Sequence, residues 1–213
     1  MARQNRKPNP KPKPSGAAPH RTADGVVGLR IIGGKLRGRR VRYSGDSRTR
    51  PMKDRLREAV FNLIGPSISG KHAVDLFAGT GALGLEAISR GAALATFIEQ
   101  HRPTAALIEQ NIRELGVEGR ANVTVGNTFI WLRRTPDLGP GPWAVFCSPP
   151  YDFYVERADE MLELIEQLVI SAPAGSVFVV EADDRFDFGT LPEAASWNVR
   201  SYPPAVVGIL RKE

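Results

Sequence analysis

The sequence contains a single cysteine, Cys147, and lacks any apolar run of about 18 residues that would cross a membrane. One cysteine excludes an internal disulfide framework and a multi-cysteine metal site, and it is typical of a reducing compartment. The basic N-terminus is not followed by the apolar segment of a secretory signal. We therefore expect a monomeric cytoplasmic protein with no bound metal and no membrane partner.

Acidic residues are scarce at the start of the chain. Residues 1 to 57 contain 17 Lys or Arg against three Asp, a net charge of +14, so the whole-chain charge of +6 leaves −8 for residues 58 to 213. A basic N-terminal segment followed by an acidic remainder favours binding of a polyanion by that segment, because neutralising phosphates releases counterions. The alternative is a solvated tail that only keeps the protein in solution.

The composition divides the chain into three expected parts. Residues 1–28 alternate Lys, Pro and other polar residues, which predicts a disordered basic tail. Residues 29–65 predict a basic extension: a hairpin turning at Gly33-Gly34, then a helix starting after Pro51 whose basic side chains face outward. Residues 66–213 predict the main domain.

Within that domain, apolar strands alternate with amphipathic helices. The expected strands are 73–77, 94–99, 122–125, 143–147, 176–181, 197–201 and 206–211, and the expected helices are 82–90, 103–115, 127–134 and 155–170. Alternating βα units need crossovers, so the pattern predicts an α/β, Rossmann-like, doubly wound and mostly parallel sheet. The last two strands are joined by a short turn and are expected to pair antiparallel.

A glycine loop follows the first of these strands. The segment from Gly79 to Gly84 matches G-x-G-x-x-G, which suits either a dinucleotide or S-adenosylmethionine. Asp75 favours the second ligand, because its carboxylate would attract an ammonium group and repel a pyrophosphate. Glu99 ends the next strand, where an acid would accept both ribose hydroxyls. The alternatives are a strand-end cap for Asp75 and a helix-start acid for Glu99.

Two further segments complete the expected site. Asn127 is typical of a helix N-cap, and with Thr128 it would also lie beside an adenine. The rigid turn from Ser148 to Tyr151 offers acceptors for an exocyclic amine and a ring on which a flipped base stacks. Cys147 raises the alternative of thiolate catalysis, although the end of an apolar strand is typical of a buried, inert cysteine.

Four segments together resemble the bacterial 16S ribosomal RNA guanine-N2 methyltransferase family. They are Arg30 to Arg39, Arg50 to Asn62, Asp75 to Glu86 and Pro149-Pro150-Tyr151. The resemblance implies a methyltransferase core that uses S-adenosylmethionine, a basic RNA-engaging extension that closes over the active site at Arg50-Pro51, and 16S ribosomal RNA or the small ribosomal subunit as partner.

The expected site residues fall into three groups. The catalytic group is Ser148, Pro149, Pro150 and Tyr151. The cofactor-binding group is Asp75, Phe77, Ala78, Gly79, Thr80, Gly81, Glu99, Gln100, Asn127 and Thr128. The RNA-binding group is Lys35, Arg37, Arg39, Arg40, Arg50, Lys53 and Arg57.

One residue departs from the family pattern, whose catalytic turn normally begins with Asp or Asn. Ser148 stands at that position and offers a single shorter hydroxyl. The leading hypothesis is an active guanine-N2 methyltransferase. The alternatives are a silent RNA- and cofactor-binding assembly factor and, on the glycine pattern alone, an NAD-linked oxidoreductase.

Overall fold

The structure, a computed structural model, describes residues 27–46, 49 and 51–213. The strands are β1 (Val27–Arg30), β2 (Arg40–Tyr43), β3 (His72–Asp75), β4 (Leu94–Glu99), β5 (Ala121–Val125), β6 (Trp143–Cys147), β7 (Val177–Asp183), β8 (Asn198–Tyr202) and β9 (Ala205–Arg211). The helices are α1 (Asp54–Ile64), α2 (Ala82–Ser89), α3 (Arg102–Leu115), α4 (Thr128–Arg133), α5 (Phe153–Glu156) and α6 (Ala158–Ser171). Four short 3₁₀ turns span Gly65–Ile68, Glu118–Arg120, Phe188–Thr190 and Ala194–Ser196.

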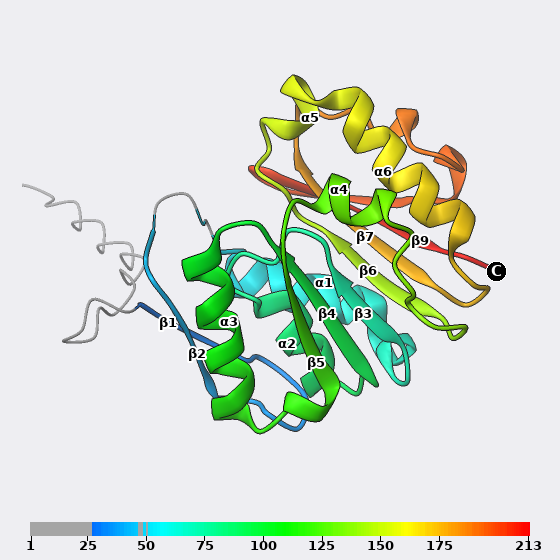
Figure 1. The fold of residues 1–213 in the computed structure, drawn as a ribbon. Coiled ribbons are helices and arrows are strands. Elements are labelled where there is room, and N and C mark those ends of the chain that lie inside the picture. The colour runs from blue at the N-terminus through cyan, green and yellow to red at the C-terminus, as the bar shows by residue number, and fades with distance from the viewer. Residues whose placement is uncertain (1–26, 47–48, 50) are drawn as a thin grey trace, which may run out of the picture.

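The main sheet has seven strands in the order β5-β4-β3-β6-β7-β9-β8. The first five are parallel neighbours, whereas β9 runs antiparallel between β7 and β8. Helices α1, α2 and α3 cover one face and α4, α5 and α6 the other (Figure 1). This confirms the predicted α/β, Rossmann-like sheet with a C-terminal antiparallel pair.

Both faces of the sheet are buried, because strand side chains alternate between two apolar cores. Ala73 and Phe146 belong to the core under α1 to α3, whereas Val74 and Val145 belong to the core under α4 to α6. The central strands therefore consist of nearly continuous apolar residues. Asp75 and Glu99 fall at the carboxyl ends of β3 and β4, where they are available to a site, whereas the buried Thr96 within β4 is paired with His72.

The N-terminal hairpin is present, but its turn differs from the prediction. Strands β1 and β2 pair antiparallel with Arg30 opposite Arg40, so residues 31–39 form a longer connection rather than a two-residue turn. β1 also begins at Val27, inside the segment predicted to be tail; residues 1–26 lie outside the described residues. The reason for the longer connection is contact with α2: a Cβ on Gly34 would lie 1.9 Å from the Ser89 carbonyl oxygen.

The helix predicted over 155–170 is broken at Arg157 into α5 and α6. Arg157 has φ −135°, and its guanidinium lies 4.0 Å from the centre of the Phe129 ring. The same guanidinium donates to Glu160 at 2.8 Å. A cation–π contact with Phe129 and an ion pair with Glu160 fix the Arg157 side chain at this break.

Within the described part of the chain, no helix combines the length and apolar character needed to cross a membrane.

Candidate functional site

The carboxyl ends of the parallel strands surround one large cavity of about 1170 Å³. This is the edge where open α/β sheets bind ligands, beside the point where the strand order reverses between β3 and β6. Its lining includes the predicted residues Phe77, Gly79, Glu99, Gln100, Asn127, Thr128, Lys53 and all four residues from Ser148 to Tyr151. The topology thus brings together segments that are far apart in the sequence.

The glycine loop turns sharply beneath this cavity. Gly79 and Gly81 have φ of +50° and +74°, in the left-handed region that favours glycine. A Cβ on Gly79 would lie 3.1 Å from the Thr49 methyl group, so the segment before Pro51 packs directly over the loop. Gly84 serves packing: a Cβ there would meet the Phe97 ring at 2.3 Å. Only two of the three glycines therefore shape the ligand-side backbone.

Asp75 lies beneath the glycine loop and is 1% exposed. Its Oδ2 accepts a hydrogen bond from the Gly84 amide at 3.1 Å. Burial raises the pKa of Asp75 to about 7; the Gly84 hydrogen bond opposes this shift, and the nearby Glu99 charge adds to it. The carboxylate thus reaches one amide of the predicted glycine segment, that of Gly84 in the first turn of α2. Asp75, Ala78, Thr80 and Gly81 are not among the residues that line the cavity, so their proposed contribution is to shape the loop.

Glu99 and Asn127 both line the cavity, and the side chain of each accepts hydrogen bonds from backbone amides. Glu99 Oε2 accepts from the Gly79 amide at 2.8 Å, and its Oε1 accepts from the His101 amide at 2.7 Å. Asn127 caps α4 by accepting from the amides of Phe129 and Ile130. The Thr128 hydroxyl donates to the Leu76 carbonyl. The predicted cap at Asn127 is confirmed, and Glu99 combines its helix-start contact with a position on the cavity.

The turn after β6 is tied to β7 by a residue that the sequence reasoning missed. The Ser148 hydroxyl donates to Glu181 Oε2, and the Tyr151 hydroxyl donates to Glu181 Oε1 at 2.8 Å. The register of β6 and β7 pairs Cys147 with Val180, which places Ser148 beside Glu181. A signal for Glu181 was present, because it ends an apolar run just as Glu99 does.

Cys147 is not suited to thiolate catalysis. It is 2% exposed, and burial raises the pKa of its thiol to about 12. Its Sγ lies 3.7 Å from the Tyr154 hydroxyl oxygen. A thiol that stays protonated is a weak nucleophile, so the structure favours the inert, buried reading.

Arg57 corrects one prediction about the basic residues. It was expected to face outward and bind RNA, but it is 1% exposed. Its guanidinium donates to Asp54 at 3.1 Å and to the Arg30 carbonyl at 2.7 Å, and it lies 3.9 Å from Glu86. Desolvation lowers the pKa of Arg57, and both acids oppose that shift. Helical periodicity turned Arg57 inward with Val60, Phe61 and Ile64, and its charge is compensated by the partly exposed Asp54 and the buried Glu86.

The remaining basic residues divide between two locations. Lys53 lines the cavity, together with the exposed Arg55 and Arg185, which were not predicted as site residues. Lys35, Arg37, Arg39 and Arg40 are exposed but belong to the hairpin connection and the start of β2. That connection packs on Ser89 at the far end of α2, about 12 Å along the helix from the glycine loop. Arg50 lies outside the described residues.

Two parts of the cavity wall were not predicted, apart from Phe77, which belongs to the expected cofactor-binding group. Phe77, Phe129 and Phe153 form an aromatic cluster, with edge-to-face contacts from Phe77 to each of the other two at 6.0 Å. On another side, the β8–β9 turn contributes Tyr202 to Ala205. Neither wall has a local sequence motif, because each is assembled from residues on separate elements or at a strand turn.

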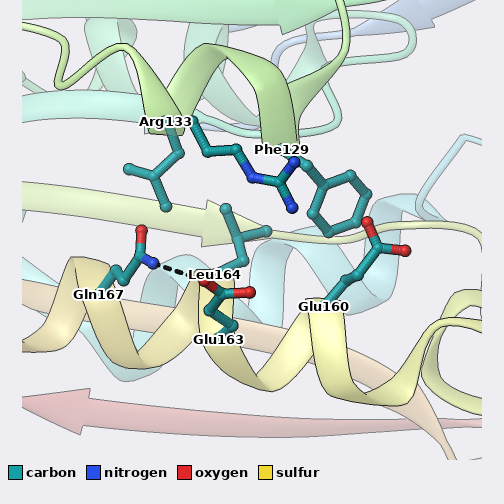
Figure 2. Close-up of a pocket in the computed structure, with 7 residues that line it drawn as sticks. Phe129, Arg133, Glu160, Glu163, Leu164 and Gln167 are labelled. Carbon is teal, nitrogen blue, oxygen red and sulfur yellow. Dashed lines mark hydrogen bonds between the residues drawn. The ribbon is translucent and has the colours of Figure 1, made fainter.

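A second hollow lies between α4 and α6 and has a volume of only about 10 Å³ (Figure 2). This is room for about one water molecule. Gln167 donates to Glu163 across its floor at 2.9 Å. Among the described residues, no group of three or more His, Cys, Asp or Glu side chains could hold a metal ion. The large cavity is therefore the candidate site.

The fold and this site define the class: an S-adenosylmethionine-dependent methyltransferase. The chain belongs to the family described as Conserved hypothetical protein 95, whose model matches residues 29–201. It is 36% identical to Ribosomal RNA small subunit methyltransferase D of Escherichia coli (strain K12) over 80% of this chain and 82% of that one. It is 31% identical to the Putative rRNA methyltransferase YlbH of Bacillus subtilis (strain 168), covering 74% and 83%.

A solved structure shows the same fold. It is described as a putative methyltransferase, yhhF, from Escherichia coli, and is 33% identical with a TM-score of 0.70, covering 87% of this chain and 98% of that one. Family membership decides the ambiguity of the glycine pattern in favour of a methyltransferase over an NAD-linked oxidoreductase. The residues also fit the cofactor, because Glu99 and the glycine loop meet at the cavity wall.

Proposed function

We propose that this protein transfers a methyl group from S-adenosylmethionine to the exocyclic N2 of a guanine in 16S ribosomal RNA. One observation carries the proposal: a single cavity joins the glycine loop and Glu99 to the turn from Ser148 to Tyr151. The relative in Escherichia coli that is named a ribosomal RNA small subunit methyltransferase supports the choice of RNA. The guanine N2 target rests on the resemblance of the sequence motifs.

The size of the cavity supports two occupants. Pockets for a single small molecule measure roughly 300 to 1000 Å³, and this one measures about 1170 Å³. The cofactor would lie over the glycine loop, with its ribose at Glu99 and its adenine near Asn127. A base taken out of the RNA would then enter beside Tyr151, whose ring provides a stacking surface.

Positioning supplies the catalysis in this scheme. When bound, S-adenosylmethionine provides an electrophilic methyl group: the lone pair on N2 forms the new N–C bond while the electrons of the C–S bond remain on sulfur. The N2 lone pair is delocalised into the guanine ring, so acceptors must hold its hydrogens and direct it towards the methyl carbon. Ser148 Oγ and the Pro149 carbonyl are the proposed acceptors. The proton that N2 loses passes to water.

Two basic surfaces would hold the RNA. Lys53, Arg55 and Arg185 lie at the cavity, where they would bind the phosphates that flank the target base. Lys35, Arg37, Arg39 and Arg40 lie at the other end of α2 and would contact more distant backbone. In this arrangement residues 29–65 form the RNA-engaging extension and residues 66–213 form the catalytic domain.

The test is methyl transfer from labelled S-adenosylmethionine to unmodified 30S subunits or naked 16S RNA, followed by nucleoside mapping. We expect label in N2-methylguanosine at one position. Label on another nucleoside would overturn the guanine N2 target but leave RNA methylation standing. No label on either substrate, with cofactor binding shown by calorimetry, would overturn the proposal.

That last outcome would favour a second candidate, a silent RNA- and cofactor-binding factor. The observation behind it is Ser148, which stands where the family normally has Asp or Asn. A silent factor would bind 16S RNA and S-adenosylmethionine as tightly as an enzyme does, but it would not transfer the methyl group.

A further inference from the structure

Glu181 is a buried acid that no part of the proposed mechanism has yet used. It lies in β7, is 5% exposed and borders the cavity. Among the residues that the structure describes, no Lys, Arg or His forms an ion pair with it. Its two oxygens instead accept hydrogen bonds from Ser148 and Tyr151. Burying an acid without a cation is costly, so its place beside the catalytic turn calls for a functional reason.

The hydrogen bond from Ser148 to Glu181 determines which way the serine hydroxyl hydrogen points. A serine hydroxyl has one hydrogen and two lone pairs, and the hydrogen rotates to whichever acceptor is available. With that hydrogen donated to Glu181, the lone pairs of Ser148 Oγ are left for other donors. An incoming amine can then donate to Ser148 without competing with its hydrogen. The hydroxyl becomes a fixed acceptor at the cavity.

The second hydrogen bond fixes the other half of the turn. Glu181 Oε1 accepts from the Tyr151 hydroxyl at 2.8 Å. This bond fixes the far end of the tyrosine ring, on which the base would stack. One carboxylate therefore aligns the acceptor for the amine and the platform for the base at the same time.

We propose that Glu181 is a positioning residue for methyl transfer, which keeps Ser148 oriented as an acceptor for the target amine and holds the Tyr151 ring in place. This inference rests on the proposed function. It also explains how serine can stand in for Asp or Asn. The side-chain oxygen of those residues always accepts hydrogen bonds, whereas a serine hydroxyl needs a neighbour to take its hydrogen.

Glu181→Gln is the most direct test, because it keeps the shape and removes one acceptor. A carboxylate accepts from both hydroxyls, but the amide accepts with Oε1 only, so Ser148 or Tyr151 loses its partner. We expect kcat for RNA methylation to fall about 10- to 100-fold, the scale of misplaced reacting groups. The Kd for S-adenosylmethionine, measured by calorimetry, should change less than about threefold, a bound that also shows that the cofactor site is folded.

Two variants at position 148 distinguish a positioning role of Glu181 from a general structural role. In the Ser148→Ala background, Glu181→Gln should cost clearly less than in the wild type, because the hydroxyl that it orients is gone. In the Ser148→Asn background, the cost should fall to about threefold or less, since an amide carbonyl accepts without help. The matched control is Glu163→Gln on α6, whose hydrogen-bond partner is Gln167, outside the site.

The outcomes are distinct. An active wild type with kcat unchanged in Glu181→Gln would overturn this inference alone. An equal loss in all three backgrounds would overturn the role assigned through Ser148, because a structural role and the Tyr151 contact are both independent of residue 148. Failure of the wild type to methylate RNA would overturn the proposed function and this inference together.

Discussion

At the residue scale, Asp75 is a buried acid whose ionisation lowers the stability of the folded protein. It is fully enclosed beneath the glycine loop, where its Oδ2 accepts a hydrogen bond from the Gly84 amide. Burial raises its pKa to about 7 from an ordinary value of 3.8. The folded protein thus favours the protonated acid, while the unfolded chain ionises at much lower pH. Ionised Asp75 therefore costs folding free energy.

The sign of this linkage gives a testable pH dependence. Because the folded-state pKa is raised, the protonated form stabilises the folded state, and this contribution is lost as pH rises from about 4 to about 7. Between pH 5 and pH 8 the wild type should lose about 2 to 3 kcal/mol of unfolding free energy relative to Asp75→Asn. Urea unfolding of both proteins at the two pH values measures this difference.

A control for this experiment is Asp183→Asn on β7. Hydrogen bonding from Arg185 lowers the pKa of Asp183, so its contribution is present above its unfolded-state pKa and is lost only at lower pH. The difference between wild type and Asp183→Asn should therefore stay constant from pH 5 to pH 8. A constant difference for Asp75→Asn as well would contradict the raised pKa.

At the element scale, Glu86 attaches the N-terminal extension to α2. It is 0% exposed, and its oxygens accept from the amides of Ile32 and Gly33 at 2.7 and 2.8 Å. Arg90 donates to it at 2.7 Å, and Arg57 lies 3.9 Å away. One carboxylate on the helix after the glycine loop thus holds the hairpin and α1 against the catalytic domain.

We expect Glu86→Ala to destabilise the protein by about 3 to 5 kcal/mol, because it leaves the buried Arg57 poorly compensated. Urea unfolding measures the loss. Trypsin should cut faster at the exposed Lys35 and Arg37, since the connection that contains them loses its anchor. Glu58→Ala, at an exposed position of α1, is the control and should change neither property. Equal stability of the two variants would show that Glu86 does not anchor the extension.

At the scale of the whole molecule, charge is divided between a basic front end and an acidic body. The fold separates the basic residues further, into those at the cavity and those at the far end of α2. Under the proposed function both groups would attract RNA phosphates, but only the first lies at the cavity that a target base would enter. Affinity and catalysis should therefore respond differently to the loss of each group.

Two double variants of equal charge change test this. Lys53→Gln with Arg55→Gln should lower both the affinity for RNA and kcat, and should flatten the dependence of log affinity on log salt by about 1 to 2 units. Lys35→Gln with Arg37→Gln should flatten the salt dependence by a similar amount and leave kcat within about threefold. Filter binding and initial rates measure the two effects. A larger loss of kcat from the second pair would place the catalytic RNA contacts at the hairpin.

Local patterns in the sequence were sufficient for most elements. The strand over 94–99 was predicted at its observed bounds, because a short apolar run between polar turns has few alternatives. The break at Arg157 was not predicted, because it depends on a ring contact with Phe129 from α4. The long connection after β1 was missed for the same reason, since its glycines meet a helix distant in the sequence.

The sequence by itself determined the class of fold, the glycine loop, the strand-end acid Glu99 and the turn from Ser148 to Tyr151, because each depends on neighbours within a few residues. Only the tertiary structure decided that Arg57 is buried and that Glu181 lies beside Ser148. Both outcomes depend on contacts between elements, the packing of α1 on α2 in one case and the register of β6 on β7 in the other. The turn from Ser148 to Tyr151 can therefore be recognised from the linear sequence, whereas the position of Glu181 beside it is fixed by the pairing of β6 with β7.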